Sequence, residues 1–155
     1  MNKYEYLLQE AYEQDIIVKE KPLQGHDGRI KGDKIAIRKS IETSAQKACV
    51  LAEELGHYYT STGNILDLND YKSTNLKQER KARAWAYDKL IGLDKLTRVH
   101  TLHNCNIYDF ADFLNVDVGF LIEAIEYYKD RYGHNVEYDD YVIQFIPYLK
   151  VFKKK

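Results

Sequence analysis

The sequence predicts an α+β domain that is mostly helical and carries a small β element. Most apolar residues recur at intervals of three and four, which is typical of amphipathic helices. Two β-branched runs, at residues 16–18 and 29–37, and an aromatic segment at 141–151 are instead typical of short strands. The 155 residues suffice for one domain with a hydrophobic core, which we assign to residues 1–150, followed by a basic tail over 151–155.

The N-terminal part is predicted to form one helix and a hairpin. Residues 2–14 show helical spacing of their apolar side chains. Within 29–37, two short strands flank the turn Lys31-Gly32-Asp33. Ile35 and Ile37 share one face of the second strand, because side chains alternate along a strand.

Each further helix is bounded by residues typical of helix ends. The predicted N-caps are Thr43, Asn106 and Asp117, and Thr43 is followed by Gln46 at the capping-box spacing. The glycines expected near the C-terminal ends are Gly63, Gly92 and Gly133. The predicted helices cover residues 44–62 and 75–91, then Asn106 through Leu114 and Asp117 through Tyr132, with a shorter helix after Asp94. Asp139-Asp140 is expected to be a turn between short strands.

Charge and cysteine content exclude several classes of protein. The chain has 23 Lys and Arg against 24 Asp and Glu, a net charge of -1, which argues against a stand-alone nucleic-acid binder. Its two cysteines cannot form a disulfide framework, so we expect a reducing cytoplasm. No apolar run approaches the length of a membrane span, and the N-terminus lacks the pattern of a secretory signal, so we expect no membrane partner.

The stretch 109–140 is strongly acidic. It holds nine Asp and Glu against two Lys and Arg. Its two predicted helices also fit a helix-turn-helix, and a DNA-binding regulator is therefore one alternative. DNA phosphates would repel these acids, so we predict no direct contact with nucleic acid. A protein partner, such as the basic DNA-reading face of a repressor, is expected instead.

The helix predicted over residues 44–62 carries a pattern that can bind a metal ion. In its run Ala52-Glu53-Glu54-Leu55-Gly56-His57, the side chains of Glu53 and His57 leave the same face of the helix. Glu54 is about 100° further round, where it can reach a metal-bound water without being a ligand. The spacing is that of the His-Glu-x-x-His motif of zinc peptidases, with Glu53 in place of the first His. The alternative is a solvated helix face with an i,i+4 pair.

The next helix offers a third ligand. Its inward stripe consists of Glu79, Ala82, Ala86 and Leu90. The alanines allow two helices to approach closely, and a carboxylate in line with them should face the partner helix. An unpaired buried carboxylate is costly, so Glu79 needs a cation, which a metal ion between the helices would supply. The alternative is a salt bridge from Glu79 to Arg83.

These two helices resemble the ImmA/IrrE metallopeptidases. The matching runs are Cys49 to Thr60, which contains the Glu-Glu-x-x-His pattern, and Glu79-x-x-Ala82-Arg83-x-Trp85-Ala86-x-x-Lys89-Leu90-Ile91. The resemblance covers about residues 1–150, most specifically 48–91, and looks like the short form found on phages and other mobile elements of Gram-positive bacteria. It implies a mostly helical, zincin-like metallopeptidase domain with a small β-hairpin or sheet, in the cytoplasm of a bacterial host.

The resemblance also implies a function. It suggests a zinc-dependent endopeptidase that acts as an antirepressor by cleaving a helix-turn-helix repressor. Matched residue by residue, Glu53, His57 and Glu79 would be the metal ligands and Glu54 the general base. The alternative is a non-catalytic antirepressor that binds the repressor stoichiometrically, which the Glu at position 53 favours.

Glu53 alters the chemistry expected of the metal ion. Two Glu and one His leave a Zn²⁺ site with a formal charge of about zero, whereas two His and one Glu leave about +1. A less positive site is a weaker Lewis acid, and oxygen ligands suit harder ions. We therefore expect weak activity, or tolerance of Mn²⁺ or another divalent ion in place of Zn²⁺.

Two other features have a weaker connection to function. His100 and His103 are three residues apart, but Thr101, Leu102 and Asn104 add no acid or thiol, so we expect surface histidines. The hairpin around residues 30–37 can offer a strand edge to an extended peptide, although most hairpins are purely structural.

Overall fold

The computed structural model describes residues 1–61 and 71–155, with the backbone alone for 71–75. Two compact units, Met1–Ala86 and Tyr87–Lys155, divide the chain, and each has its own core. The described ranges hold six α-helices and two three-stranded sheets, which confirms the expected mostly helical α+β class. No helix within these ranges is both long and apolar enough to cross a membrane.

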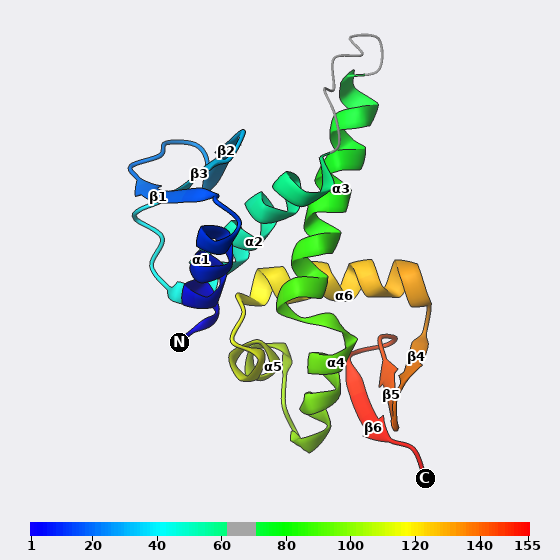
Figure 1. The fold of residues 1–155 in the computed structure, drawn as a ribbon. Helices are drawn as coiled ribbons and strands as arrows, with labels where there is room; N and C mark the ends of the chain where they lie inside the picture. Colours follow the sequence, from blue (N-terminus) through cyan, green and yellow to red (C-terminus); the bar gives the residue numbers. More distant parts are fainter. Residues whose placement is uncertain (62–70) are drawn as a thin grey trace. The chain divides into compact units, whose positions relative to one another are not determined.

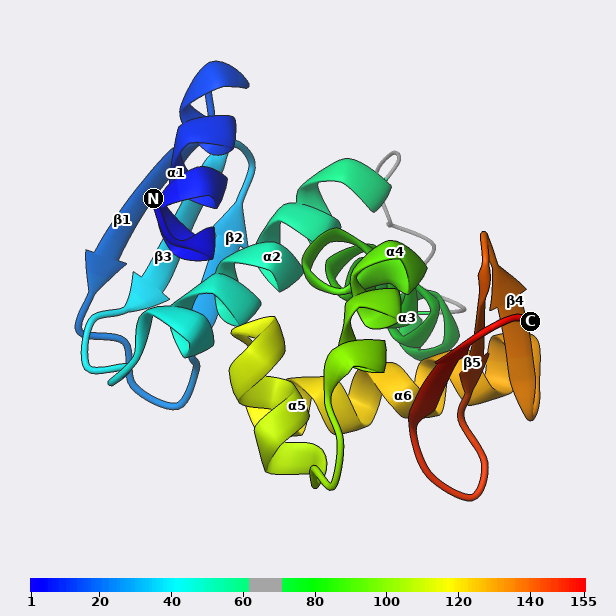
Figure 2. The ribbon, with the colours of Figure 1, turned by 90° about the horizontal axis from the view of Figure 1, so that it is seen from below.

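The first unit packs helices against one side of a small sheet, as the two views agree (Figures 1 and 2). Its elements are α1 (Lys3–Glu13), β1 (Ile17–Lys21), β2 (Gly28–Lys31), β3 (Lys34–Arg38), α2 (Ser44–Thr60) and most of α3 (Tyr71–Leu90). The strand order is β1-β3-β2, with β1 parallel and β2 antiparallel to β3. The β2–β3 hairpin and its glycine turn match the prediction, whereas the sequence pattern did not indicate the parallel pairing of β1.

Strand alternation gives this sheet two different faces. Ile35 and Ile37 of β3 are buried on the side of the helices, as their spacing predicts. On the same strand, Lys34 is exposed and Ala36 is half-buried. The core of the unit therefore lies between the sheet and α1 and α2, and the other face of the sheet is open to water.

The helix ends are set by the predicted polar caps. The side chains of Thr43, Asn106 and Asp117 accept hydrogen bonds from backbone N–H groups three residues further on. Gly92 has a left-handed φ of +66°, as expected of a residue that ends a helix. The predicted end of α2 near Gly63 lies outside the described residues. α3 begins at Tyr71, earlier than predicted, because the polar residues 71–75 have no apolar period that a pattern can detect.

The second unit joins helices to an antiparallel sheet. Its further elements are α4 (Gly92–Leu96), the 3-10 helix η1 (Thr97–Thr101), α5 (Ile107–Leu114), α6 (Val118–Tyr132), β4 (Asn135–Tyr138), β5 (Tyr141–Gln144) and β6 (Lys150–Lys153). The strand order is β4-β5-β6, and the predicted turn at Asp139 adopts a φ of +55°. Tyr128 and Phe145 are buried at its centre with their rings stacked 6.0 Å apart.

Residues 151–153 are part of this sheet, although the sequence assigned them to a basic tail. Val151 is buried and lies opposite Ile143 in the β5–β6 register. Lys154 Nζ is 2.9 Å from Glu137 Oε2. The β-branched and aromatic side chains of Val151 and Phe152 suit a strand, so the basic character of this segment does not keep it apart from the fold.

Candidate active site

The candidate site lies on α2, beside the stripe of side chains that this helix buries in the core. The stripe is formed by Ala48, Leu51, Ala52 and Leu55, all fully buried. Glu53, Glu54 and His57 lie off this stripe and are therefore only partly buried. Helical spacing thus presents all three polar side chains beside the core without placing them inside it.

α3 approaches α2 closely at Gly56. A Cβ atom at this position would overlap with the backbone carbonyl of Ala82, so the contact requires glycine. Ala82 and Ala86 are fully buried, as the small-residue stripe predicts. The approach brings His57, the residue after Gly56, to Glu79, which lies three residues before Ala82.

His57 and Glu79 are in direct contact. His57 Nε2 lies 3.0 Å from Glu79 Oε1, a hydrogen-bonding distance. The second carboxylate oxygen, Glu79 Oε2, is 3.9 Å from Arg83 Nε, at the outer limit of an ion pair. Arg83, the salt-bridge partner considered from the sequence, therefore lies beside Glu79, but His57 is nearer.

Glu54 has an unusual proton affinity for a carboxylate. Burial raises its pKa to about 7, and the negative charges of Glu53 and then Glu79 add to this effect. Strand β2 contributes to the burial, since a Cβ atom at Gly28 would lie 3.0 Å from both Cγ and Oε1 of Glu54. A carboxylate with this pKa can both accept and return a proton near neutral pH.

Gly28 is a site residue that the sequence analysis did not identify. The only local signal was a glycine at the head of a predicted strand, which often marks a close approach of backbone to another group. Here the close group is Glu54, 26 positions later in the chain. A local pattern cannot reveal which residue a glycine approaches.

The side chains of the three predicted metal ligands are not grouped around a common point where one metal ion could bind. Within residues 1–61 and 76–155, no three His, Cys, Asp or Glu side chains are arranged to hold a metal ion. The structure joins His57 to Glu79, and the charges of Glu53 and Glu79 both act on Glu54. The assignment of Glu53 as a ligand therefore remains a prediction based on its spacing.

The donors nevertheless suit a divalent metal ion in kind and nearly in spacing. Imidazole nitrogen and carboxylate oxygen both bind zinc at about 2.0–2.2 Å, so two such donors in a tetrahedral shell lie about 3.3–3.5 Å apart. The 3.0 Å between His57 Nε2 and Glu79 Oε1 is only slightly shorter. Carboxylates crowded enough to raise a pKa would also be stabilised by a nearby cation.

A hollow opens beside His57. Its lining comes from the β2–β3 hairpin, the end of α2 and α3, and consists of Ile30, Gly32, His57, Tyr58, Ser61 and Gln78. Strand β2 pairs only with β3 among the described strands, so its other edge is free. A free edge can add an extended peptide as a further strand, and the hollow then offers room for that peptide's side chains.

The other histidines have no such arrangement. His100 Nδ1 lies 2.7 Å from the backbone oxygen of Thr97, and its ring packs on Tyr141 with 4.7 Å between the centroids. His103 is exposed. Neither belongs to a group of three potential ligands in the described part of the chain.

Comparison with known proteins assigns a family. The family model Peptidase M78, the IrrE N-terminal-like domain, matches residues 11–126, a range that includes all of the predicted site residues. No curated protein and no solved structure matches the chain. Because the family model matches well over half of the 155 residues, the chain belongs to the M78 peptidase family of IrrE N-terminal-like domains.

Proposed function

We propose that this chain is a metal-dependent endopeptidase that acts as an antirepressor. Its substrate would be a helix-turn-helix repressor of a phage or mobile element, in the cytoplasm of a Gram-positive host. The proposal depends most on one observation, the contact of His57 with Glu79 beside the carboxylate of Glu54. Membership in the M78 family supports peptidase chemistry, and the ImmA/IrrE resemblance supports the choice of substrate.

Glu53, His57 and Glu79 would hold the metal ion. When bound, Zn²⁺ or a harder divalent ion such as Mn²⁺ would polarise the scissile carbonyl and lower the pKa of water. The 3.0 Å contact supports the pairing of His57 with Glu79. Helical i,i+4 spacing supports Glu53 as the third ligand, because its side chain leaves α2 on the same face as that of His57.

Glu54 would move the protons of the reaction. As a carboxylate it takes a proton from the attacking water, and as a carboxylic acid it gives a proton to the amide nitrogen of the leaving group. A pKa of about 7 suits both steps, since each protonation state is well populated at neutral pH. The free edge of β2, which adjoins Glu54 at Gly28, would hold the substrate segment in an extended conformation.

Removal of the proton acceptor tests this mechanism. The purified chain is incubated with the helix-turn-helix repressor encoded beside it, and cleavage is followed by mass spectrometry. Glu54→Gln should reduce the rate by at least about 100-fold, while the fold and the bound metal are retained. Glu42→Gln, which makes the same chemical change at an exposed glutamate outside the site, should leave the rate unchanged. Normal cleavage by Glu54→Gln would refute the role of Glu54.

A non-catalytic antirepressor is the second candidate. Glu53 in place of the first His favours it, as does the lack of a three-ligand set within residues 1–61 and 76–155. Turnover separates the two functions, because a catalyst destroys a molar excess of repressor and is stopped by EDTA. A stoichiometric binder would inactivate one equivalent, leave the repressor intact and be insensitive to the chelator.

A further inference from the structure

The outer face of the β1–β3–β2 sheet is a dense cluster of cations. We call it the cationic sheet face, and its five exposed basic residues are Lys19, Lys21, Arg29, Lys31 and Lys34. The strand register sets them in rows, with Lys19 and Arg29 on either side of Ala36 and Lys31 directly opposite Lys34. Because Ala36 is small, the face is hollowed at its centre and the long basic side chains surround the hollow.

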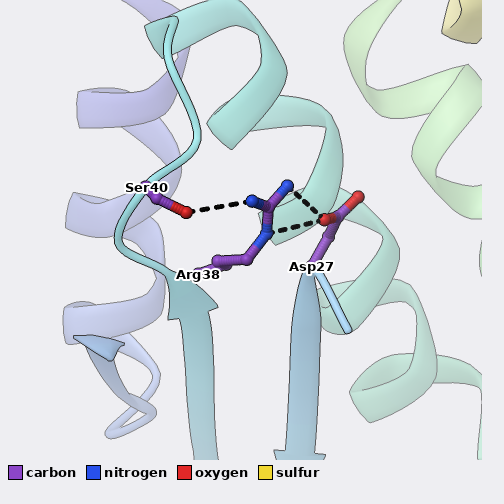
Figure 3. A network of polar contacts seen from close by, with 3 residues as sticks. All are labelled: Asp27, Arg38 and Ser40. Atoms are coloured by element: carbon purple, nitrogen blue, oxygen red, sulfur yellow. Dashed lines mark hydrogen bonds and ion pairs between the residues drawn. The ribbon is translucent and has the colours of Figure 1, made fainter. Parts of the chain in front are cut away.

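Two of the three acids in residues 17–39 are engaged by other residues, and the third, Asp33, lies in the β2–β3 turn and forms no ion pair within the described ranges. Glu20 alternates to the helix side of β1, where it accepts hydrogen bonds from the Tyr4 hydroxyl and from Lys47 Nζ, each at 2.9 Å. Asp27 is held at 2.7 Å by Arg38, whose guanidinium also donates to Ser40 (Figure 3).

The five cations themselves have no such partners. None of them forms an ion pair with another residue of the described ranges. The positive charge of the face is therefore available to a ligand from solution.

The fold does not need this arrangement. Like charges directly opposite each other on neighbouring strands destabilise a sheet, and Lys31 and Lys34 are such a pair. A polar face with mixed charges would serve solubility equally well. A bound anionic partner would offset the repulsion among these unpaired cations and make their arrangement favourable.

We propose that the cationic sheet face binds the sugar–phosphate backbone of double-stranded DNA without reading its sequence. Duplex DNA carries one negative charge per about 1.7 Å of its axis, so a face about 17 Å long meets several phosphates. The face carries no aromatic side chain on which unpaired bases could stack, which argues against a single strand. Modules for double-stranded RNA span about 16 base pairs, far more than these strands can cover.

This inference reverses the expectation of no direct contact with nucleic acid. That expectation rested on the net charge of -1 and on the acidic stretch 109–140. Residues 17–39, by contrast, hold seven Lys and Arg against three Asp and Glu. Strand alternation gathers six of the seven on one face, namely the five unpaired cations and Arg38, which is paired with Asp27. The inference does not depend on the proposed peptidase activity.

A salt titration measures the proposed binding. Anisotropy of a labelled 20-base-pair DNA duplex is followed with the full chain at 50 and 200 mM KCl. Contacts with three to five phosphates predict a slope of about -3 to -4.5 for log K against log salt, or about 60- to 500-fold weaker binding at the higher salt concentration. No binding at 50 mM KCl, or a slope near zero, would refute the proposal.

Two charge-matched variants test the location. Lys19→Gln combined with Arg29→Gln and Lys34→Gln should weaken binding at 50 mM KCl by at least about tenfold and reduce the slope by about 2–3. The control removes the same charge from exposed lysines of the other unit, Lys150→Gln with Lys153→Gln and Lys155→Gln, and should change affinity less than about twofold. Equal losses in both variants would mean that net charge alone is responsible and would overturn the proposal.

Two further measurements do not depend on how the variants fold. In NMR spectra of the unmodified chain, duplex DNA should shift amide signals of β1, β2 and β3, and shifts confined to other elements would overturn the proposal. A poly-glutamate peptide that binds the face more tightly than the duplex would identify an acidic protein as the partner instead. Glu54→Gln should bind DNA normally, which keeps this result separate from the outcome of the cleavage test.

Discussion

The two faces of strand β2 border environments of opposite charge. Gly28 and Ile30 face the α2 side, where the carboxylates of the candidate site lie, whereas Arg29 and Lys31 belong to the cationic sheet face. On the α2 side the charges are negative and partly buried, so burial and mutual repulsion raise the pKa of Glu54. On the outer side the charges are positive and surrounded by water, which weakens their mutual repulsion.

The difference shows what each environment can do. A carboxylate exchanges protons readily near neutral pH only when its pKa is raised, and burial on the packed side raises the pKa of Glu54. Binding of a long polyanion requires many accessible cations, which only the open side supplies. Changes on the packed side should therefore have large effects, and changes on the open side should have small effects on stability.

The largest change in stability is expected at Gly56, where α2 meets α3. Gly56→Ala should lower the free energy of unfolding by about 1–3 kcal/mol, because the new methyl group overlaps with the Ala82 carbonyl and forces the helices apart. Urea denaturation measures this, and loss of metal binding should accompany it. Gly119→Ala, at an exposed position in α6, is the control; its Cβ atom would lie 3.1 Å from Asp117 Oδ2, a side-chain atom that can shift, so stability should change by less than about 1 kcal/mol. Equal effects at both glycines would contradict the close approach.

The next effect is a dependence of stability on pH in the metal-free protein. The pKa of Glu54 rises from an ordinary 4.5 to about 7, so the folded state holds more protons than the unfolded state between these values. The free energy of unfolding should therefore fall as the pH rises from about 4.5 to above 7. Glu54→Gln removes this dependence. The free energy of unfolding of Glu54→Gln minus that of the unmodified protein should be about 1–2 kcal/mol larger at pH 8 than at pH 5, after allowance for partial exposure.

Urea denaturation at both pH values, in the presence of EDTA, measures this difference. Glu42→Gln is again the control, and its free energy of unfolding should depend on pH in the same way as that of the unmodified protein. A difference between Glu54→Gln and the unmodified protein that is the same at pH 5 and pH 8 would show that Glu54 titrates in its ordinary range.

A smaller effect is expected where Glu53 replaces the first His of the zinc-peptidase motif. Glu53→His should raise the cleavage rate by about tenfold, equivalent to about 1.4 kcal/mol, because a more positive metal site is a stronger Lewis acid. The same change removes a charge that raises the pKa of Glu54, so the acid limb of the pH–rate profile should move to lower pH. Rates and zinc content are compared for both forms, and equal rates with tightly bound zinc would show that Glu53 does not weaken the site.

The smallest effect is expected on the cationic sheet face. Lys31→Glu places opposite charges across the β2–β3 register and should raise the free energy of unfolding by about 0.2–1 kcal/mol. Lys31→Gln, which only removes the repulsion from Lys34, should give a smaller rise. Thermal denaturation measures both, and destabilisation by Lys31→Glu would mean that Lys31 has a structural role in the sheet.

The elements that could be predicted are those built from local interactions. Thr43, Asn106 and Asp117 each cap a helix through a backbone group three residues away, so their roles are visible in a short window of sequence. The hairpin turn at Gly32 is equally local. Helix α3 was predicted to begin too late, because residues 71–75 are polar and join the helix without an apolar pattern of their own.

Apart from the start of α3, the missed features depend on residues far apart in the chain. The parallel pairing of β1 with β3 and the place of Val151 in β6 need partners that no local pattern specifies. The same holds for Gly28 beside Glu54. For the candidate site, the sequence predicted four residues, and the structure brings His57 and Glu79 together. The roles assigned to all four residues are still predictions.

The sequence by itself determined the three polar helix caps, the hairpin and the types of side chain that α2 and α3 carry. Only the tertiary structure decided which of these side chains meet, because contact between distant residues depends on packing such as that of Gly56 against Ala82. It also decided how charge is distributed. The net charge of -1 sums the charged residues on both faces of each strand, so it suggests a near-neutral protein. Strand register separates these faces, and thereby sets the carboxylates of the candidate site on one side of a thin sheet and the unpaired cations on the other.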